Sequence, residues 1–219
     1  MANIIAKMEE LGCKAVIFDL DGTILDNNAF HLKSWKEYLS KINREMSDEE
    51  YNEHINGRTN KDVVRYLYGD DLSDEEIWKY TMDKEAIYRE MYKPYIKAVD
   101  GLEEMLRLLD QHDIPMAIAT SGVQVNIDFM FDNVPIKKFF KKVVDSSYID
   151  KGKPDPEIFL KTAEFLDTPA ERCLVFEDAV VGVKAARGAG MKVIAVLTTH
   201  TREELADADE IINNYKEML

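Results

Sequence analysis

The chain has 219 residues, and 28 lysine and arginine residues against 42 aspartate and glutamate residues give a formal net charge of −14. Hydrophobic residues make up 46% of it, a globular composition at a length that can bury a substantial core. The negative charge excludes a nucleic-acid binder, because no basic stripe is present to release counterions from a phosphate backbone. The apolar runs are far shorter than the roughly 20 residues that span a bilayer. We expect no membrane segment and, from the acidic start of the chain, no signal peptide.

The two cysteines, Cys13 and Cys173, lie far apart and have no metal-ligand spacing. We expect both to be small buried hydrophobic residues of a reduced, cytoplasmic protein.

Short apolar segments without polar alternation recur along the chain, as is typical of parallel strands covered on both faces. Stretches with helical periodicity separate them, for example over residues 102–109 and 158–166. This rhythm predicts an α/β fold with a doubly wound, Rossmann-like parallel sheet. The expected strands lie at residues 14–18, 114–119, 142–144, 173–176 and 192–196.

The rhythm breaks between residues 26 and 95, where helix patterns occur without a convincing strand. Ser47 and Ser73 each precede acidic residues and predict helix N-caps. We therefore expect a core of residues 1–25 and 96–219, with residues 26–95 inserted as an all-helical domain. The acidic stretch 203–210 is interpreted as a solvated helix and loop.

Asp19 and Asp21 follow directly on the first predicted strand. Ligands of open α/β sheets bind beyond the carboxyl ends of the strands, so both carboxylates lie where a site is expected. A calcium-binding loop would continue with ligands at alternate positions, whereas apolar residues follow here. Taken alone, the segment is better explained as a turn with solvated acids.

Three further polar features follow later strands or precede a helix. Thr120 and Ser121 end the second strand, where they can bind phosphate oxygens or simply cap a helix. Lys153 lies between a glycine and a proline just before a helix. Glu177 and Asp178 lie at the end of another predicted strand. They are either ligands of a hard cation or a charge pair at the start of a helix.

In this order, the motifs D-L-D-G-T, Thr120, G-K-P-D-P and Glu177-Asp178 resemble those of the haloacid dehalogenase (HAD) superfamily of phosphotransferases. The resemblance covers nearly the whole chain, and the helical insert resembles the small cap of that superfamily. It is most similar to the β-phosphoglucomutase-like subgroup.

The resemblance implies a role for each of these residues. Asp19 would be the nucleophile that forms an aspartyl-phosphate, and Asp21 the general acid and base. Mg²⁺ would bind to Asp19, the backbone carbonyl of Asp21 and Asp178, with Glu177 holding a metal-bound water. The phosphoryl group would be held by Thr120, Ser121 and Lys153.

The resemblance also distinguishes between the reactions that members of the superfamily catalyse. Halide leaves without a proton, whereas an alkoxide needs one, so a general acid at Asp21 favours phosphatase or phosphomutase chemistry. In the cap, the resemblance implies that His31, Arg58 and Asn60 face the substrate. His31 is equally explained as a packing histidine at the interface, and Arg58 as a surface arginine. The arginine with which the mutases bind a second phosphate falls on Asn60, so hydrolysis of a small phosphomonoester, such as a sugar phosphate, is the preferred interpretation.

Two alternatives remain at this point. One is a β-phosphoglucomutase-type mutase. The other is a non-catalytic phospho-acceptor domain of the receiver type, which would have about half this length and no helical insert. The expected partner is a small phosphorylated metabolite, and we expect a monomer.

Overall fold

The computed structural model describes residues 3–219 of the chain. Its centre is a six-stranded sheet with the order β3-β2-β1-β4-β5-β6, in which every neighbouring pair is parallel. The predicted doubly wound parallel sheet is thereby confirmed. The strands are β1 (Ala15–Phe18), β2 (Met116–Ala119), β3 (Lys142–Val144), β4 (Cys173–Glu177), β5 (Lys192–Val196) and β6 (Glu210–Ile212).

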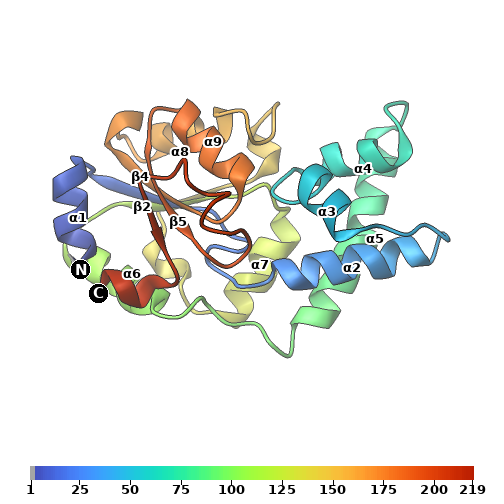
Figure 1. The fold of residues 1–219 in the computed structure, drawn as a ribbon, viewed down its shortest axis with the longest axis horizontal. Coiled ribbons are helices and arrows are strands. Elements are labelled where there is room, and N and C mark those ends of the chain that lie inside the picture. The colour runs from blue at the N-terminus through green and yellow to red at the C-terminus, as the bar shows by residue number, and fades with distance from the viewer. Residues whose placement is uncertain (1–2) are drawn as a thin grey trace.

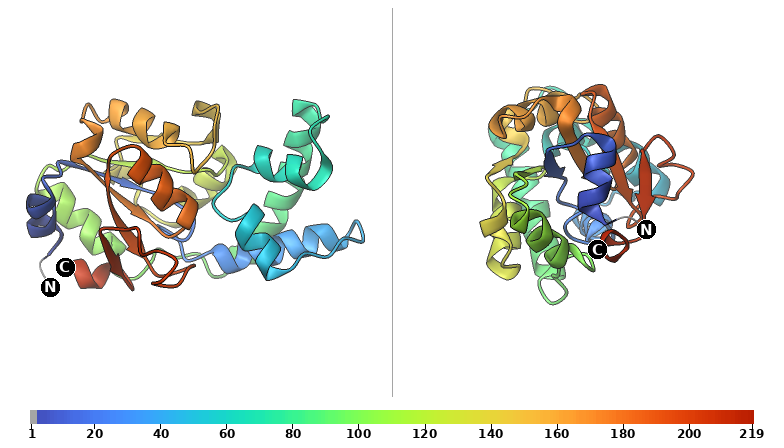
Figure 2. Two further views of the ribbon diagram at one scale, coloured as in Figure 1. Left: turned by 45° about the horizontal axis from the view of Figure 1, so that its top comes forward. Right: turned by 90° about the vertical axis from the view of Figure 1, so that its left-hand side faces the viewer.

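Helices cover both faces of the sheet (Figures 1 and 2). Successive residues of β1 point to opposite faces, so Val16 and Phe18 join one hydrophobic core and Ala15 and Ile17 the other. The first core includes α1 (Ile4–Leu11), α6 (Leu102–Gln111) and α7 (Gln124–Asn133). The second includes α8 (Glu157–Phe165) and α9 (Val180–Gly188). Short 3₁₀ helices are η1 (Lys137–Phe139), η2 (Ser146–Tyr148), η3 (Ala170–Arg172) and η4 (Tyr215–Met218).

The remaining helices form a separate layer beside the sheet, which we call the helical part (Figure 1). It consists of α2 (Asn28–Ser40), α3 (Asp48–His54), α4 (Asn60–Tyr68) and α5 (Asp74–Tyr92), and a hydrophobic cluster around Trp35 and Leu39 holds it together. The N-caps predicted at Ser47 and Ser73 are confirmed, since each side chain accepts a backbone N–H of its helix. The chain enters and leaves the helical part by adjacent segments, where Leu25 pairs with Ala98.

Two details of the fold differ from the sequence-based expectation. Helix α1 was not anticipated, although the Asn3 side chain caps its start and Gly12, at φ 70°, ends it. The stretch 203–210 is not helical: turns lead into β6, which begins at Glu210. A strand of three residues at the sheet edge is too short to give a recognisable hydrophobic pattern. The segment that leads into β6 is held instead by Asp209, which accepts hydrogen bonds from Arg187 and from the backbone N–H of Val193.

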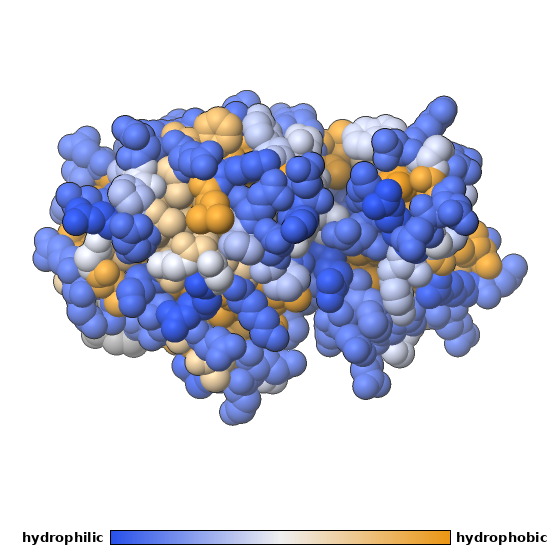
Figure 3. Space-filling view, turned by 90° about the horizontal axis from the view of Figure 1, so that it is seen from above, coloured by the Kyte–Doolittle hydropathy of each residue, from blue (hydrophilic) through white to orange (hydrophobic). Residues whose placement is uncertain are grey.

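Other features agree with the sequence. Cys13 and Cys173 are both buried and free. Within residues 3–219 no helix combines the length and the apolar character needed to cross a membrane. The face shown in Figure 3 is mainly hydrophilic, with hydrophobic residues in separate patches.

Candidate active site

The carboxyl end of the sheet faces the helical part, and a small cavity of about 70 Å³ lies between them. We call it the central cavity. Because parallel strands present the same ends to one edge, the residues that follow β1, β2 and β4 meet there. The structure brings every residue singled out in the sequence to its walls, namely Asp19, Asp21, His31, Arg58, Asn60, Thr120, Ser121, Lys153, Glu177 and Asp178.

Lys153 joins two strand ends through its ammonium group. Its Nζ donates to Oδ1 of Asp19 and to Oε1 of Glu177, each at 2.6 Å, and all three side chains are buried. Burial would lower the pKa of Lys153, but the two carboxylates outweigh it and hold the pKa above its ordinary value. Lys153 is therefore a fixed cation of the site and not a solvated surface lysine.

Asp19, Glu177 and Asp178 form a buried acidic cluster whose ligand oxygens all lie within 4.8 Å of one another. Burial raises the pKa of Asp19 to about 8, with Lys153 acting against this and Glu177 adding to it. The pKa of Asp178 is also raised well above its ordinary value, mainly by burial and then by Glu177. The second oxygen of Glu177 accepts the backbone N–H groups of Asp178 and Ala179 at 2.9 Å, which fixes its carboxylate.

Neighbouring polar groups hold the Asp178 carboxylate in place. Oδ1 accepts from Thr23 at 3.2 Å, and Oδ2 accepts from Asn28 at 2.8 Å and from the Thr199 hydroxyl. Gly22 makes this approach possible, because a Cβ at that position would lie 2.0 Å from Asp178 Oδ2. The sequence analysis missed Thr199; its position just after β5, at the same sheet edge, was the available signal.

The donor set fits a divalent cation. Three buried carboxylates face a single buried ammonium group, so the cluster carries excess negative charge when its acids are ionised. Hard cations such as Mg²⁺ prefer carboxylate and carbonyl oxygens of this kind. Burial, and then the neighbouring carboxylates, raise the pKa values of Asp19 and Asp178, and a bound cation would lower both pKa values.

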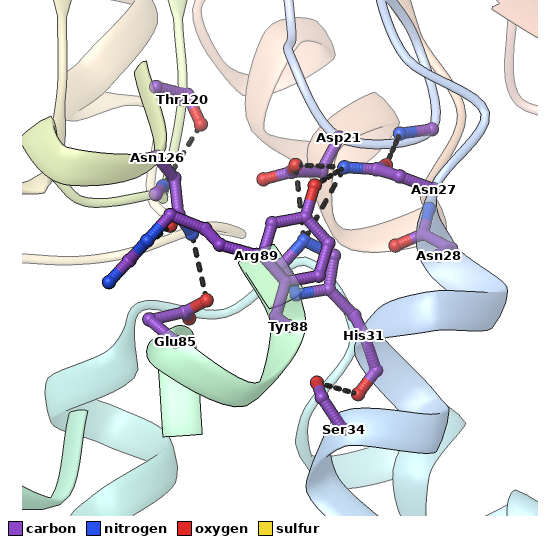
Figure 4. A network of polar contacts seen from close by, with 12 residues as sticks. Asp21, Asn27, Asn28, His31, Ser34, Glu85, Tyr88, Arg89, Thr120 and Asn126 are labelled. Atoms are coloured by element: carbon purple, nitrogen blue, oxygen red, sulfur yellow. Dashed lines mark hydrogen bonds and ion pairs between the residues drawn. The ribbon is translucent and has the colours of Figure 1, made fainter. Parts of the chain in front are cut away.

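Asp21 is not one of the three acids of the cluster, and it belongs to a hydrogen-bonded network with Asn27 and His31 (Figure 4). Its Oδ1 accepts from Asn27 Nδ2 at 2.6 Å and lies 3.2 Å from His31 Nε2. Burial raises the pKa of Asp21, but His31 and Asn27 outweigh it and hold the pKa below its ordinary value. The Asn27 amide also donates to the Tyr88 hydroxyl at 2.6 Å, and the Tyr88 ring stacks on His31 at 3.8 Å between centroids.

The network continues from His31 into α5 and then to the core. Lys84 Nζ lies 2.8 Å from His31 Nδ1 and 3.0 Å from Glu85 Oε1. Asn126 of α7 donates to Glu85 Oε2 at 2.8 Å and accepts from Arg89 at 3.0 Å. Polar contacts thus connect the helical part to the core across the central cavity. The sequence analysis missed these residues, because a Lys-Glu pair within a helix is indistinguishable from ordinary surface charge.

The remaining predicted residues surround the space above the acidic cluster. The Thr120 hydroxyl accepts the Gly122 N–H at 2.9 Å, and the Ser121 hydroxyl donates to the Gly57 carbonyl of the helical part at 3.1 Å. Neither is the N-cap of α7, which is Val123. Arg58 is half-buried and donates only to a backbone carbonyl, that of Glu53 at 3.3 Å, among residues 3–219. Because Val123 caps α7, the alternative that Thr120 or Ser121 is a helix N-cap is wrong.

The fold and this site define a class of protein. Residues 16–196 match the haloacid dehalogenase-like hydrolase family, and the chain belongs to that family. It is similar to "5-amino-6-(5-phospho-D-ribitylamino)uracil phosphatase, chloroplastic" of Arabidopsis thaliana, at 25% identity over 99% of this chain and 59% of that protein. It is also similar to β-phosphoglucomutase of Bacillus subtilis, at 30% identity over 84% of this chain and 83% of that protein.

Among solved structures, a HAD hydrolase of family IA, variant 3, from Entamoeba histolytica superposes with a TM-score of 0.83 at 32% identity. That match covers 94% of this chain and 95% of the other. The chain spans little more than half the length of the Arabidopsis phosphatase, so it corresponds to one part of that longer protein.

Proposed function

We propose that this protein is a Mg²⁺-dependent phosphatase that hydrolyses a small phosphomonoester through an aspartyl-phosphate on Asp19, with residues 26–95 acting as a cap over the site. The observation that carries the proposal is the contrast between two carboxylates on one chain segment. Asp19 is held by Lys153 within the acidic cluster, whereas Asp21 is held outside it by Asn27 and His31. Paired carboxylates in different surroundings are suited to different roles.

Asp19 and Asp178 would hold Mg²⁺, with Glu177 beside them. The family resemblance adds the backbone carbonyl of Asp21 to these ligands. When bound, the ion would neutralise charge on the phosphoryl oxygens and on the acidic cluster. The support for this is the fit of the buried carboxylates to a hard cation.

In the first step, an Asp19 carboxylate oxygen attacks phosphorus and the bond from phosphorus to the ester oxygen breaks. Asp21 gives its proton to the departing alkoxide. A phosphoryl dianion beside Asp21 raises the pKa of that carboxyl, which favours the protonated form that this step requires. The alcohol leaves, and the phosphoryl group stays on Asp19.

In the second step, Asp21 takes a proton from water, and the water oxygen attacks phosphorus. The bond between phosphorus and Asp19 breaks, which releases phosphate and restores the carboxylate. Lys153 compensates the charge of Asp19 throughout, while Thr120 and Ser121 donate hydrogen bonds to the phosphoryl oxygens.

Hydrolysis is favoured over mutase chemistry by the polar residue at Asn60. A mutase must bind two phosphates in turn, and at this position of the central cavity there is an amide and no cation. The uracil-derivative phosphatase of Arabidopsis supports hydrolysis, and the β-phosphoglucomutase of Bacillus supports the alternative. β-Glucose 1-phosphate separates the two: a mutase yields glucose 6-phosphate, whereas a phosphatase yields free phosphate.

The proposal is tested by measuring phosphate release from a panel of small phosphate esters with and without Mg²⁺, on the full chain and on Asp19→Asn. We expect Mg²⁺-dependent release with the native chain and none above background with Asp19→Asn. Substantial turnover by the folded variant would refute the nucleophile assignment. A cytoplasmic location and a monomeric state stay predictions, to be checked by fractionation and by light scattering.

A further inference from the structure

Tyr51 of α3 is a buried residue of the helical part that also lines the central cavity. Its side chain is 4% exposed, and it is the one buried residue of that helix. Its ring belongs to the hydrophobic cluster around Trp35 and Leu39, which fixes its position. The Tyr51 side chain therefore extends from the interior of the helical part to the wall of the central cavity.

The Tyr51 hydroxyl has no hydrogen-bond partner among residues 3–219. Other buried tyrosines differ: the Tyr38 hydroxyl accepts from the Tyr68 hydroxyl at 3.1 Å, and the Tyr215 hydroxyl donates to the Thr23 carbonyl at 3.1 Å. A buried hydroxyl without a partner costs free energy, and most buried tyrosines find one. Phenylalanine would fill the same space without this cost, so packing alone does not account for the hydroxyl.

The surroundings of the Tyr51 hydroxyl are those of the central cavity. Burial, and then the carboxylates of Asp21, Asp178 and Glu85, raise the pKa of Tyr51 above its ordinary value. All three acids line the central cavity, on the core side and on α5. The hydroxyl therefore keeps its proton at neutral pH and can both donate and accept. Because the cavity is small, an ester bound at Asp19 would lie close to this wall.

We propose that the Tyr51 hydroxyl forms a hydrogen bond with an oxygen of the alcohol part of the ester, which makes Tyr51 a specificity-determining residue. This inference rests on the proposed phosphatase function and adds to it a residue of the helical part. An alcohol part with a second oxygen completes the bond, whereas a plain hydrocarbon alcohol leaves the buried hydroxyl without a partner. Discrimination of this kind arises wherever a site is built to hydrogen-bond its substrate.

Tyr51→Phe removes the hydroxyl and keeps the ring. Tyr38→Phe is the matched control, because Tyr38 belongs to the same hydrophobic cluster but does not line the central cavity. The control loses the hydrogen bond to Tyr68, so its melting temperature should fall by about 2–4 °C. Tyr51→Phe should melt at the native temperature or above it. A fall as large as that of the control would reveal a partner within the protein and overturn the proposal.

The kinetic test uses two kinds of ester. Glycerol 1-phosphate, β-glucose 1-phosphate and glucose 6-phosphate carry further hydroxyls, whereas the alcohol part of cyclohexyl phosphate has no hydrogen-bonding group of its own. For the hydroxyl-bearing ester that the native chain hydrolyses fastest, Tyr51→Phe should lower kcat/KM about tenfold, as expected for one lost hydrogen bond. It should leave cyclohexyl phosphate unaffected, and Tyr38→Phe should affect neither ester. Equal losses with both kinds of ester would contradict the proposed contact.

A binding measurement separates this inference from the phosphatase activity. Titration calorimetry in the presence of Mg²⁺ compares Asp19→Asn with Asp19→Asn/Tyr51→Phe. The double variant should bind the hydroxyl-bearing esters about tenfold more weakly, and inorganic phosphate, which has no alcohol part, equally well. Equal affinity for the esters refutes the role of Tyr51 while sparing the phosphatase. If the native chain hydrolyses none of the esters but the difference in binding persists, the phosphatase is refuted and the role of Tyr51 stands.

Discussion

Lys84 Nζ lies 2.8 Å from Nδ1 of His31, and both side chains are buried. With Lys84 charged, its ammonium group can only donate, so we assign Nδ1 as the acceptor and the ring hydrogen to Nε2. Nε2 is the atom that lies 3.2 Å from Asp21 Oδ1. Lys84 therefore sets the tautomer with which His31 donates to the proposed general acid.

The first prediction concerns this donor. We expect His31→Ala to lower kcat about 10- to 100-fold, because Asp21 loses a partner that orients its carboxylate. His31→Gln, whose amide can place a donor near the position of Nε2, should recover part of the loss. The measurement is kcat and KM on one hydrolysed ester for the three proteins.

A merely structural histidine would behave differently. In that case His31→Ala would lower the melting temperature without a selective effect on kcat, and His31→Gln would give no recovery of turnover. That outcome would contradict a positioning role for His31.

The second prediction concerns Lys153, the buried cation between Asp19 and Glu177. Removing one partner of a buried ion pair leaves uncompensated charge, so Lys153→Met should lower the free energy of unfolding by about 3–5 kcal/mol near neutral pH. It should also reduce kcat by orders of magnitude, because the charge of the nucleophile is no longer balanced. Urea unfolding and steady-state kinetics measure the two effects.

Lys161→Met is the matched control for this substitution. Lys161 also pairs with a glutamate, Glu157, but on an exposed face of α8, where ion pairs contribute little. We expect nearly native stability and activity from it. If Lys153→Met resembled this control, Lys153 would not be the fixed cation that we describe.

The sequence predicted those features that are determined by a few consecutive residues. The segment before Asp19 is apolar, ends abruptly and lies within a repeating pattern, so the strand, the sheet and the site edge followed from it. Lys153 was singled out because a glycine and a proline flank it. These signals arise within a few consecutive residues.

The features that were missed depend on contacts between distant segments. Glu85 is buried only because α5 packs near α7 and Asn126 is there to bind it. A role for Thr199 becomes visible only in the folded structure, where its hydroxyl donates to Asp178. Helical periodicity cannot reveal a buried polar pair whose partner lies elsewhere in the chain.

The third prediction concerns the bridge between the helical part and the core. Asn126→Ala removes the group that binds both Glu85 and Arg89, and it leaves a buried carboxylate oxygen without its donor. We expect a loss of about 2 kcal/mol in the free energy of unfolding and faster hydrogen exchange in α5. Asn133→Ala, at the exposed end of the same helix, should change the free energy by about 0.5 kcal/mol or less. Equal effects of the two substitutions would show that the bridge is not a stabilising contact.

The last prediction concerns metal removal and pH. The pKa of Asp19 is raised to about 8 in the folded, metal-free protein, above its ordinary value of 3.8. The folded state therefore binds more protons here than the unfolded state, and this group's contribution to stability falls as pH rises from about 4 to about 8. A divalent cation binds the ionised cluster and should restore that loss.

We expect Mg²⁺ to raise the melting temperature strongly at pH 8 and little at pH 5, where protons compete for the same oxygens. Differential scanning fluorimetry with Mg²⁺ and with a chelator at both pH values measures this. Asp178→Asn is the control, because it removes one carboxylate of the cluster and so should lose most of the Mg²⁺-dependent shift. A shift of equal size at both pH values, or one retained in Asp178→Asn, would place the ion outside the acidic cluster.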